Sequence, residues 1–475
     1  MSSRHDSLQP PTRREPTESV PLTFSQLWTW TVLELHQARS TRSVTVAQRL
    51  SGPLSHQALI DSVVILVRRH DSLRTTIVVS NGIPLQSIAT DHGYQLEVID
   101  LSSLPSGARE LQAKTLAEQL AHEPIDVAVG PLFAARLLRM GYEDHVLIFT
   151  LDHIISDGAS VAILLRDLWT LYAQSVRKLP FRLPELPLQF ADYAVWERKT
   201  HSLWVERHGA YWNKRLSGAA RLQLFPRVAV TPTRPRMKLL PFEVAETVCG
   251  ELRKFVRRSG TTVAMSIFTA YVALLLRWCN TTDVVVSFVT LGRNFPALKH
   301  TIGYFGCSTF LRIESRAEDT FLDLLRRVTQ EYATAYQHAD SGRVAAEIPA
   351  PNFAANPRFN WHPGHFNLSS TGEIHELGQE TGLGMRHSPF EIAHRTDFDG
   401  RGGGPELMLG DSNGIIKGDF WYRADLYQSS AAERFERNLR YFVGLMVTAP
   451  RTRVAELSCN ESSLGDAFVV ADSRG

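Results

Sequence analysis

The spacing of apolar residues along the chain predicts a mixture of helices and strands. In several segments apolar residues recur every three to four positions, the period of an amphipathic helix, and elsewhere short β-branched runs are typical of strands. The predicted helices are residues 24–36, 111–124, 159–176, 261–279, 320–336 and 430–447. Residues 59–79 are predicted as a helix passing into a strand, residues 131–158 as two strands around a Gly-Tyr-Glu-Asp turn, and residues 283–292, 358–363 and 414–427 as further strands.

A proline-rich segment divides this pattern into two parts. The segment "RKLPFRLPELPLQF", residues 177–190, is typical of an extended connector, and about 150 residues per domain is usual. We therefore predict an α/β (α+β) protein with an N-terminal half at residues 21–180 and a C-terminal half at residues 181–465. Residues 1–20 are polar and contain prolines, which predicts a disordered lead-in.

Composition narrows the classes of function. Hydrophobic residues make up 44% and charged residues 21%, which is ordinary for a globular protein in solution. A formal net charge of +2 gives no reason to expect a nucleic acid or membrane partner. The apolar runs are shorter than the about 20 residues that span a bilayer, and the N-terminus has no apolar signal core, so a cytoplasmic protein is expected. The four cysteines lack CxxC spacing, which favours reduced thiols over a zinc site.

Several common catalytic motifs are missing from the sequence. It contains no G-x-S-x-G, G-x-x-x-x-G-K-[ST], G-x-G-x-x-G or H-E-x-x-H. His362 and His365 in "HPGH" have the spacing of possible metal ligands, but the proline and glycine between them favour a turn. No carboxylate or thiolate is spaced to complete such a site, so no metal is predicted there.

The segment "DHIISDG", residues 152–158, carries the candidate chemistry. It follows the apolar run "VLIFTL" and precedes a predicted helix. Ser-Asp-Gly is good turn chemistry, so a surface turn is one interpretation. The other is a histidine on a rigid strand end, where His153 can accept a proton from an amine or hydroxyl near neutral pH. Asp157 would then be buried, and it would need a cationic partner.

Five blocks in order resemble the condensation domains of nonribosomal peptide synthetases, in the chloramphenicol-acetyltransferase-like superfamily. "DHIISDG" is similar to the hallmark H-H-x-x-x-D-G, with Asp152 in place of the first histidine. "RHDSLRT" resembles R-H-E-x-L-R-T, and "FADYAVW" resembles Y-x-D-Y-A-x-W. "LTFSQLWTW" and "TIGYFGCSTF" resemble the opening and I-G-x-F-V-N-T blocks with changes, while "QHADSGR" resembles its block only faintly. The resemblance covers about residues 20–460.

The resemblance implies two acetyltransferase-like halves in a V shape, with a tunnel at their junction. It also implies an acyltransferase without a bound cofactor, whose substrate is presented on the phosphopantetheine arm of a carrier protein. An amine or hydroxyl of a small-molecule or carrier-bound acceptor would attack the acyl thioester. Since the chain shows no adenylation domain and no carrier segment, we expect a free-standing enzyme that meets an acyl or peptidyl carrier protein in trans.

The resemblance also implies roles for individual residues. His153 matches the catalytic histidine, which acts as general base or positions the nucleophile. Gly158 matches the glycine whose backbone lies near the reacting thioester. Asp157 matches a structural aspartate that pairs with an arginine of the other half, and Arg293 in "TLGRNF" occupies the matching place.

Asp152 is the main departure from the family pattern. Adjacent residues near a strand end face opposite ways, so Asp152 is expected to support the site from behind His153. The leading hypothesis is an acyltransferase in natural-product biosynthesis. A second is a catalytically silent domain that binds carrier-bound intermediates and recruits another enzyme, which the missing first histidine leaves open. A third is an acyltransferase of the same superfamily that uses acyl-coenzyme A.

Overall fold

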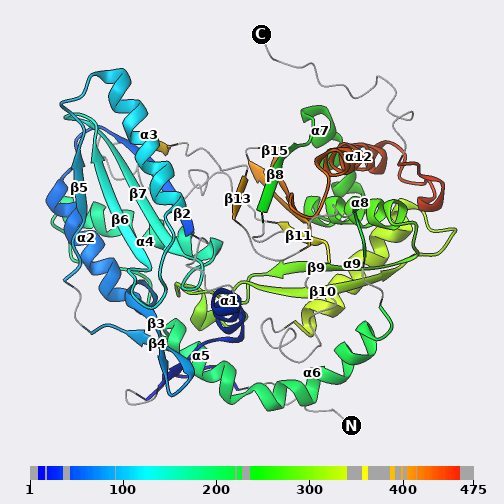
Figure 1. Ribbon diagram of the computed structural model, residues 1–475, viewed down its shortest axis with the longest axis horizontal. Coiled ribbons are helices and arrows are strands. Elements are labelled where there is room, and N and C mark those ends of the chain that lie inside the picture. Colours follow the sequence, from blue (N-terminus) through cyan, green and yellow to red (C-terminus); the bar gives the residue numbers. More distant parts are fainter. Residues whose placement is uncertain are drawn as a thin grey trace. The chain divides into compact units, whose positions relative to one another are not determined.

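The computed structural model divides into two compact units, each built around its own sheet (Figure 1). Unit 1 comprises residues 1–207, 291–307 and 367–394, and unit 2 comprises residues 208–290, 308–366 and 395–475. Within them the structure describes residues 9–15, 19–35, 43–90, 93–219, 222–226, 236–339, 356–361, 386–390, 397–399, 404–412 and 414–459.

Unit 1 has a five-stranded sheet of order β12-β2-β7-β6-β5, in which only the β5–β6 pair is parallel. Its strands are β2 (Ser43–Ser51), β5 (Glu97–Asp100), β6 (Phe133–Arg139), β7 (Asp144–Asp152) and β12 (Arg386–Pro389). A smaller antiparallel sheet contains β1 (Val20–Pro21), β3 (Thr75–Ser80) and β4 (Ile83–Ile88). The helices are α1 (Phe24–Leu35), α2 (His56–Arg69), α3 (Ser106–His122), α4 (Gly158–Val176) and α5 (Phe190–Lys199), with 3₁₀ turns η1 (Asp71–Arg74) and η2 (Pro296–Leu298).

Both faces of β7 are covered, which explains its continuous apolar sequence. Leu147 and Phe149 pack in one core with side chains of α2 and α4. Val146 and Ile148 alternate with them and pack in a second core with Ala113 of α3. Since successive side chains of a strand point to opposite faces, the run "VLIFTL" places a buried strand directly before the candidate turn.

Unit 2 has a seven-stranded sheet of order β10-β9-β11-β14-β15-β8-β13. Its strands are β8 (Arg236–Glu243), β9 (Asp283–Thr290), β10 (Cys307–Glu314), β11 (Arg358–Trp361), β13 (Asp397–Asp399), β14 (Glu406–Ser412) and β15 (Ile415–Arg423). Its helices are α7 (Glu246–Ser259), α8 (Val263–Trp278), α9 (Phe321–Gln337) and α12 (Ser429–Thr448), and α12 is followed by a 3₁₀ turn, η4 (Val454–Glu456). The helix α6 (His201–Leu216) begins in unit 1 and ends in unit 2. The apolar helix α8 is almost entirely buried and packs against α9 and α12.

The predicted helices and strands are present, but the unit boundary differs from the predicted one. The connector at residues 177–190 lies wholly inside unit 1, because the following helix α5 packs on β1 and η1 of that unit. Residues 291–307 also belong to unit 1 although they follow a strand of unit 2. The expected disordered lead-in also differs at residues 9–15, where the Trp196 indole donates to the Gln9 carbonyl at 2.7 Å.

Among the described residues, no single helix is both long and apolar enough to cross a membrane. The pair α7 and α8 satisfies that test only jointly, and the two helices bend by 103° at the break between them. Burial of α8 in the core of unit 2 accounts for its apolar composition.

A histidine pair in unit 1, of which His145 is buried and His56 partly exposed, predicts that the chain loses stability in acid. His56 and His145 meet through their Nε2 atoms at 3.0 Å, and His145 is 1% exposed. Burial and then the nearby His56 lower the pKa of His145 to about 4, against the opposing effect of Asp144. Because this pKa lies below the unfolded value of about 6.5, the stabilisation is complete above pH 6.5 and is lost as the pH falls toward 4.

We expect His145 to contribute up to about 3 kcal/mol to the pH dependence of unfolding. The measurement is urea unfolding of the wild type and of His145→Gln at several values between pH 7.5 and about pH 4.5. The variant should show a flatter pH dependence, even if its stability at pH 7.5 is lower. Parallel curves for the two proteins would contradict the prediction.

Candidate functional site

The candidate site is the turn between β7 and α4 in unit 1. From Leu151 to Asp157 every residue is buried except His153, which is partly exposed. The backbone turns tightly here, since Ile155 N–H donates to the Asp152 carbonyl at 3.1 Å. A rigid turn thus presents one imidazole while its neighbours are held inside the unit.

Asp152 holds this turn from behind. Its carboxylate is completely buried, and Oδ1 accepts from the backbone N–H of Ile154 at 2.7 Å. Its carbonyl accepts from the Ser156 hydroxyl at 2.9 Å, while Gln26 Nε2 donates to the Ile154 carbonyl at 2.9 Å. The bond from side chain to the second following N–H is an Asx turn, which fixes the backbone on both sides of His153.

Asp157 is the centre of a buried polar cluster. It caps α4, since its Oδ1 accepts from Ser160 N–H at 2.9 Å. Its Oδ2 accepts from Arg293 Nη1 at 2.8 Å and from the backbone N–H groups of Phe305 and Gly306 at 3.1 Å each. Burial raises the pKa of Asp157, but the guanidinium and the bonds from Ser160 outweigh burial, so the pKa lies below its ordinary value.

Arg293 makes the pair predicted for it, but within one unit. A second nitrogen, Nη2, donates to Asp157 Oδ1 at 3.0 Å and to the carbonyl of Thr301 at 3.2 Å. Both partners belong to unit 1, whereas the resemblance implied a pair between the halves. The reason is that residues 291–307, although late in the sequence, form part of unit 1 and lie along α4.

Two glycines let this segment close on itself and on α5. Gly292 has φ +65°, and a Cβ there would lie 2.0 Å from the Phe305 carbonyl oxygen. At Gly303 a Cβ would lie 2.3 Å from the ring of Phe190. The Ser160 hydroxyl accepts from Gly303 N–H at 3.0 Å, so the segment is fixed where it passes the start of α4.

Tyr304 is the aromatic neighbour of His153. The two rings meet edge to face, with centroids 4.8 Å apart. Tyr304 is partly exposed, as His153 is. The phenol therefore restricts the orientation of the imidazole.

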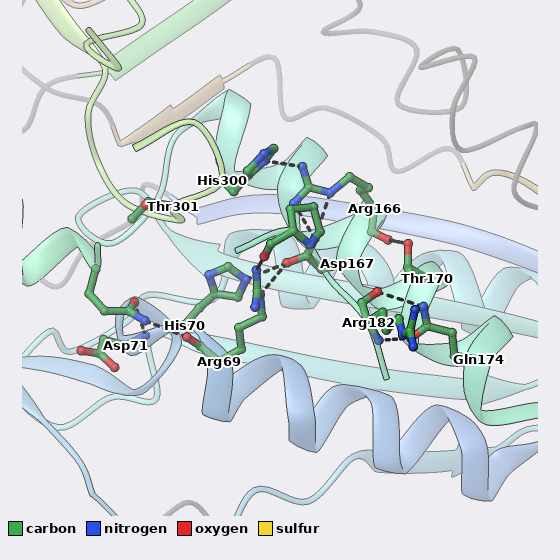
Figure 2. A network of polar contacts seen from close by, with 12 residues as sticks. Arg69, His70, Asp71, Arg166, Asp167, Thr170, Gln174, Arg182, His300 and Thr301 are labelled. Atoms are coloured by element: carbon green, nitrogen blue, oxygen red, sulfur yellow. Dashed lines mark hydrogen bonds and ion pairs between the residues drawn. The ribbon is translucent and has the colours of Figure 1, made fainter. Parts of the chain in front are cut away.

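The block "RHDSLRT" forms a second polar network farther along α4 (Figure 2). Fully buried Asp167 accepts from Arg69 Nε at 3.1 Å, His70 Nε2 at 3.0 Å and Arg166 Nε at 2.9 Å. Arg166 Nη1 also donates to His300 Nδ1 at 2.8 Å, which links α4 to the segment 291–307 again (Figure 2). Burial lowers the pKa of both histidines, so neutral imidazoles fit these bonds.

The block "FADYAVW" forms α5, where it supports the same segment. Asp192 closes a capping box with Gln189 and accepts from Arg14 Nη1 at 2.9 Å. Phe190 packs edge to face on Phe305, with ring centroids 4.9 Å apart. These bonds and ring contacts give the block a supporting position beneath the segment 291–307.

The structure therefore places His153, Asp152, Asp157 and Gly158 in one turn and brings Arg293 to it. Sequence reasoning missed Ser160 and Tyr304. A serine three residues after a helix-capping aspartate is a usable signal for Ser160, whereas nothing local indicates that Tyr304 meets His153. His362 and His365 lie outside the described residues, and the described residues contain no cluster of three or more potential metal ligands.

Asp152→Ala should weaken the turn, whereas Asp152→Asn should preserve it. Alanine leaves the buried Ile154 N–H without its acceptor, which costs about 1–3 kcal/mol, while asparagine keeps an oxygen in place. Urea unfolding compares the two variants with the wild type. Equal stability of Asp152→Ala and Asp152→Asn would contradict a role for this acceptor.

These features define a mixed helix-and-sheet protein of the chloramphenicol-acetyltransferase-like class, with the histidine motif at a strand end. The chain belongs to the condensation domain family: the family model "Condensation domain" matches residues 17–463. It is 30% identical over 452 residues to a linear gramicidin synthase of Brevibacillus parabrevis, an alignment that covers 92% of this chain and 8% of that protein. Among the most similar curated relatives, the chain spans between 3% and 41% of the relative's own length.

Solved condensation-type structures share the fold. The X-domain from teicoplanin biosynthesis aligns with a TM-score of 0.78 at 21% identity, covering 94% of this chain and 99% of that one. The first condensation domain of the calcium-dependent antibiotic synthetase, in complex with a substrate analogue, aligns with a TM-score of 0.72 at 18% identity, covering 93% and 100%. The relatives place the chain among domains of nonribosomal peptide synthetases.

Proposed function

We propose that the chain is an acyltransferase that joins an acyl thioester, carried on the phosphopantetheine arm of a carrier protein, to an amine or hydroxyl acceptor. The observation that carries this proposal is the exposure pattern of the turn: His153 alone is partly exposed between buried residues on either side. A turn selected only for packing has no need to present an imidazole there.

The proposed chemistry uses His153 and the start of α4. The acceptor nitrogen or oxygen attacks the thioester carbon, and His153 takes the proton that the acceptor loses. Collapse of the adduct breaks the carbon–sulfur bond, and the proton passes to the departing thiolate. The amide or ester and the free thiol of the arm are the products.

Gly158 supports this reaction through its backbone. It is the first residue of α4 and is partly exposed, and N–H groups of a first helical turn have no intrahelical acceptor. Such an N–H near the thioester polarises its carbonyl and stabilises the charge that develops on the oxygen. Asp157 and Arg293 fix the position of this helix start relative to the segment 291–307.

A silent recruitment domain is the second candidate. The observation that favours it is Asp152, which stands where the family motif has its first histidine and which is buried in the turn. The contacts of Asp152 favour the enzyme, because they fix the backbone beside His153 and leave that side chain partly exposed.

The test is to incubate the protein with an acylated carrier protein and a panel of amines and alcohols, and to follow the intact mass of the carrier. Acyl loss that requires both an acceptor and His153 supports the proposal. Binding of the carrier without turnover across the panel would favour recruitment. Turnover of acyl-coenzyme A without any carrier would favour an acyltransferase that uses acyl-coenzyme A.

A further inference from the structure

An open groove of about 510 Å³ lies between α2 and the proline-rich segment of unit 1. Its walls combine apolar side chains with polar ones: Ile65, Leu171, Phe181, Leu183 and Leu186 lie beside Arg68, Arg69 and Gln189. Because the groove is open to solvent rather than enclosed, it suits the surface of a partner protein better than a small molecule, which binds in an enclosed pocket. Neither the candidate turn nor its supporting networks explain why this groove is left open.

The outer wall of the groove is held in place. Arg182 N–H donates to Gln174 Oε1 at 2.8 Å, and Gln174 Nε2 donates to the Arg182 carbonyl at 2.9 Å (Figure 2). Farther along, Arg13 Nε donates to the Pro187 carbonyl at 2.9 Å. Three prolines restrict the same segment, so it loses little further freedom when a partner binds.

This fixed segment exposes large apolar side chains. Leu179 is 51% exposed and Phe181 is 49% exposed, although the chain here is neither a terminus nor a tight turn. Adjacent exposed apolar residues on an ordered surface are typical of an interaction site. Phe181 also lines the groove, so it can serve as an anchor for a partner.

Basic residues surround the apolar walls. Exposed Arg68 lines the groove, and Lys178 and Arg182 flank Phe181 in an exposed stretch, whereas Arg69 is paired with Asp167. Between residues 176 and 189 the only acidic residue is Glu185. The whole chain has a net charge of only +2, so this concentration of positive charge is local.

We propose that this groove docks a protein partner that presents carboxylates around an apolar side chain. The inference rests on the proposed function, in which the partner is the carrier protein, and it requires the carrier's docking surface to be acidic. The surface that we call the docking groove comprises the walls of the groove with Arg68, Lys178 and Arg182. An anionic membrane fits less well, because a concave groove cannot insert its apolar walls into a lipid surface.

The experiment measures binding of two phosphopantetheinylated carrier domains, one strongly acidic and one nearly neutral, to the full chain. We expect the acidic domain to bind more tightly, and Arg68→Glu/Arg182→Glu to weaken it by at least about tenfold. Phe181→Ala should weaken it by a similar factor. The control, Lys114→Glu/Lys214→Glu, makes the same change in net charge at exposed sites outside the groove and should bind within about twofold of the wild type.

Turnover of a soluble acyl-N-acetylcysteamine thioester separates docking from chemistry. The groove variants should keep it, since this substrate needs no docked carrier, whereas His153→Ala should lose it. If the wild type did not turn over this soluble thioester, the result would count against the proposed function. The binding measurements would still test the docking groove. Equal binding of the acidic domain to the wild type and to both groove variants would overturn the docking proposal, as would binding of anionic phosphatidylglycerol vesicles in place of either carrier domain.

Discussion

His153→Ala is expected to abolish acyl transfer while leaving the fold intact. Loss of a positioned general base lowers turnover by about 10²- to 10⁴-fold, which brings the reaction close to the background hydrolysis of a thioester. The fold should persist because His153 is the partly exposed member of its turn, and the turn is also held by the bond from Ile154 N–H to Asp152 and by the pair of Asp157 with Arg293. Product formation from an acylated carrier, measured by intact mass, gives the rate.

A matched control separates the effect of the imidazole from a general loss of structure. His122, another partly exposed histidine at the end of α3, can be replaced by alanine in parallel. Both variants should unfold within about 1 kcal/mol of the wild type, and only His153→Ala should lose turnover. Normal turnover by pure His153→Ala protein would remove His153 from the mechanism.

The sequence predicted the elements of this fold well, because each has a strong local signal. The run "VLIFTL" is apolar on both faces and forms β7, which is covered by α2 and α4 on one side and α3 on the other. The alternation in residues 131–158 likewise predicted the hairpin of β6 and β7. Such patterns depend only on which side chains are buried, so they can be recognised directly in the sequence.

The division into units was less accessible to sequence reasoning. A proline-rich segment usually separates domains, yet residues 177–190 are held inside unit 1 by hydrogen bonds from Gln174 and Arg13. The segment 291–307 joins unit 1 through contacts more than a hundred residues away in sequence, such as Arg293 with Asp157. No local pattern records a pairing of that kind.

The candidate site shows the same limit. A buried aspartate at a strand end requires a cation, which is a physical prediction from the sequence, but only the family resemblance indicated which arginine supplies it. Ser160, Tyr304 and the backbone donors of Phe305 and Gly306 come from two distant segments that fold together. Their roles follow from geometry that hydrophobic periodicity does not encode.

Asp157→Ala is expected to have the largest effect on stability. The variant leaves the Arg293 guanidinium buried without its carboxylate, and it removes the acceptor of Phe305 and Gly306 N–H. Breaking a buried ion pair from one side costs about 3–5 kcal/mol, of the order of a domain's whole stability. Unit 1 should therefore unfold at lower urea concentration, with early hydrogen exchange in α4.

The pH dependence of the unfolding free energy of the wild type tests the same Asp157 cluster independently. Because the pKa of Asp157 is lowered in the folded chain, its contribution is present above the unfolded value near 4 and is lost as the pH falls below it. Asp157→Asn should remove this acid-side loss, whereas Glu123→Ala, at an exposed carboxylate, should change stability by less than about 0.5 kcal/mol. Unfolding of Asp157→Ala at the wild-type urea concentration would contradict the role of this cluster in fixing residues 291–307 to α4. The rigid support of His153 and Gly158 would then have to come from Asp152 and Gln26.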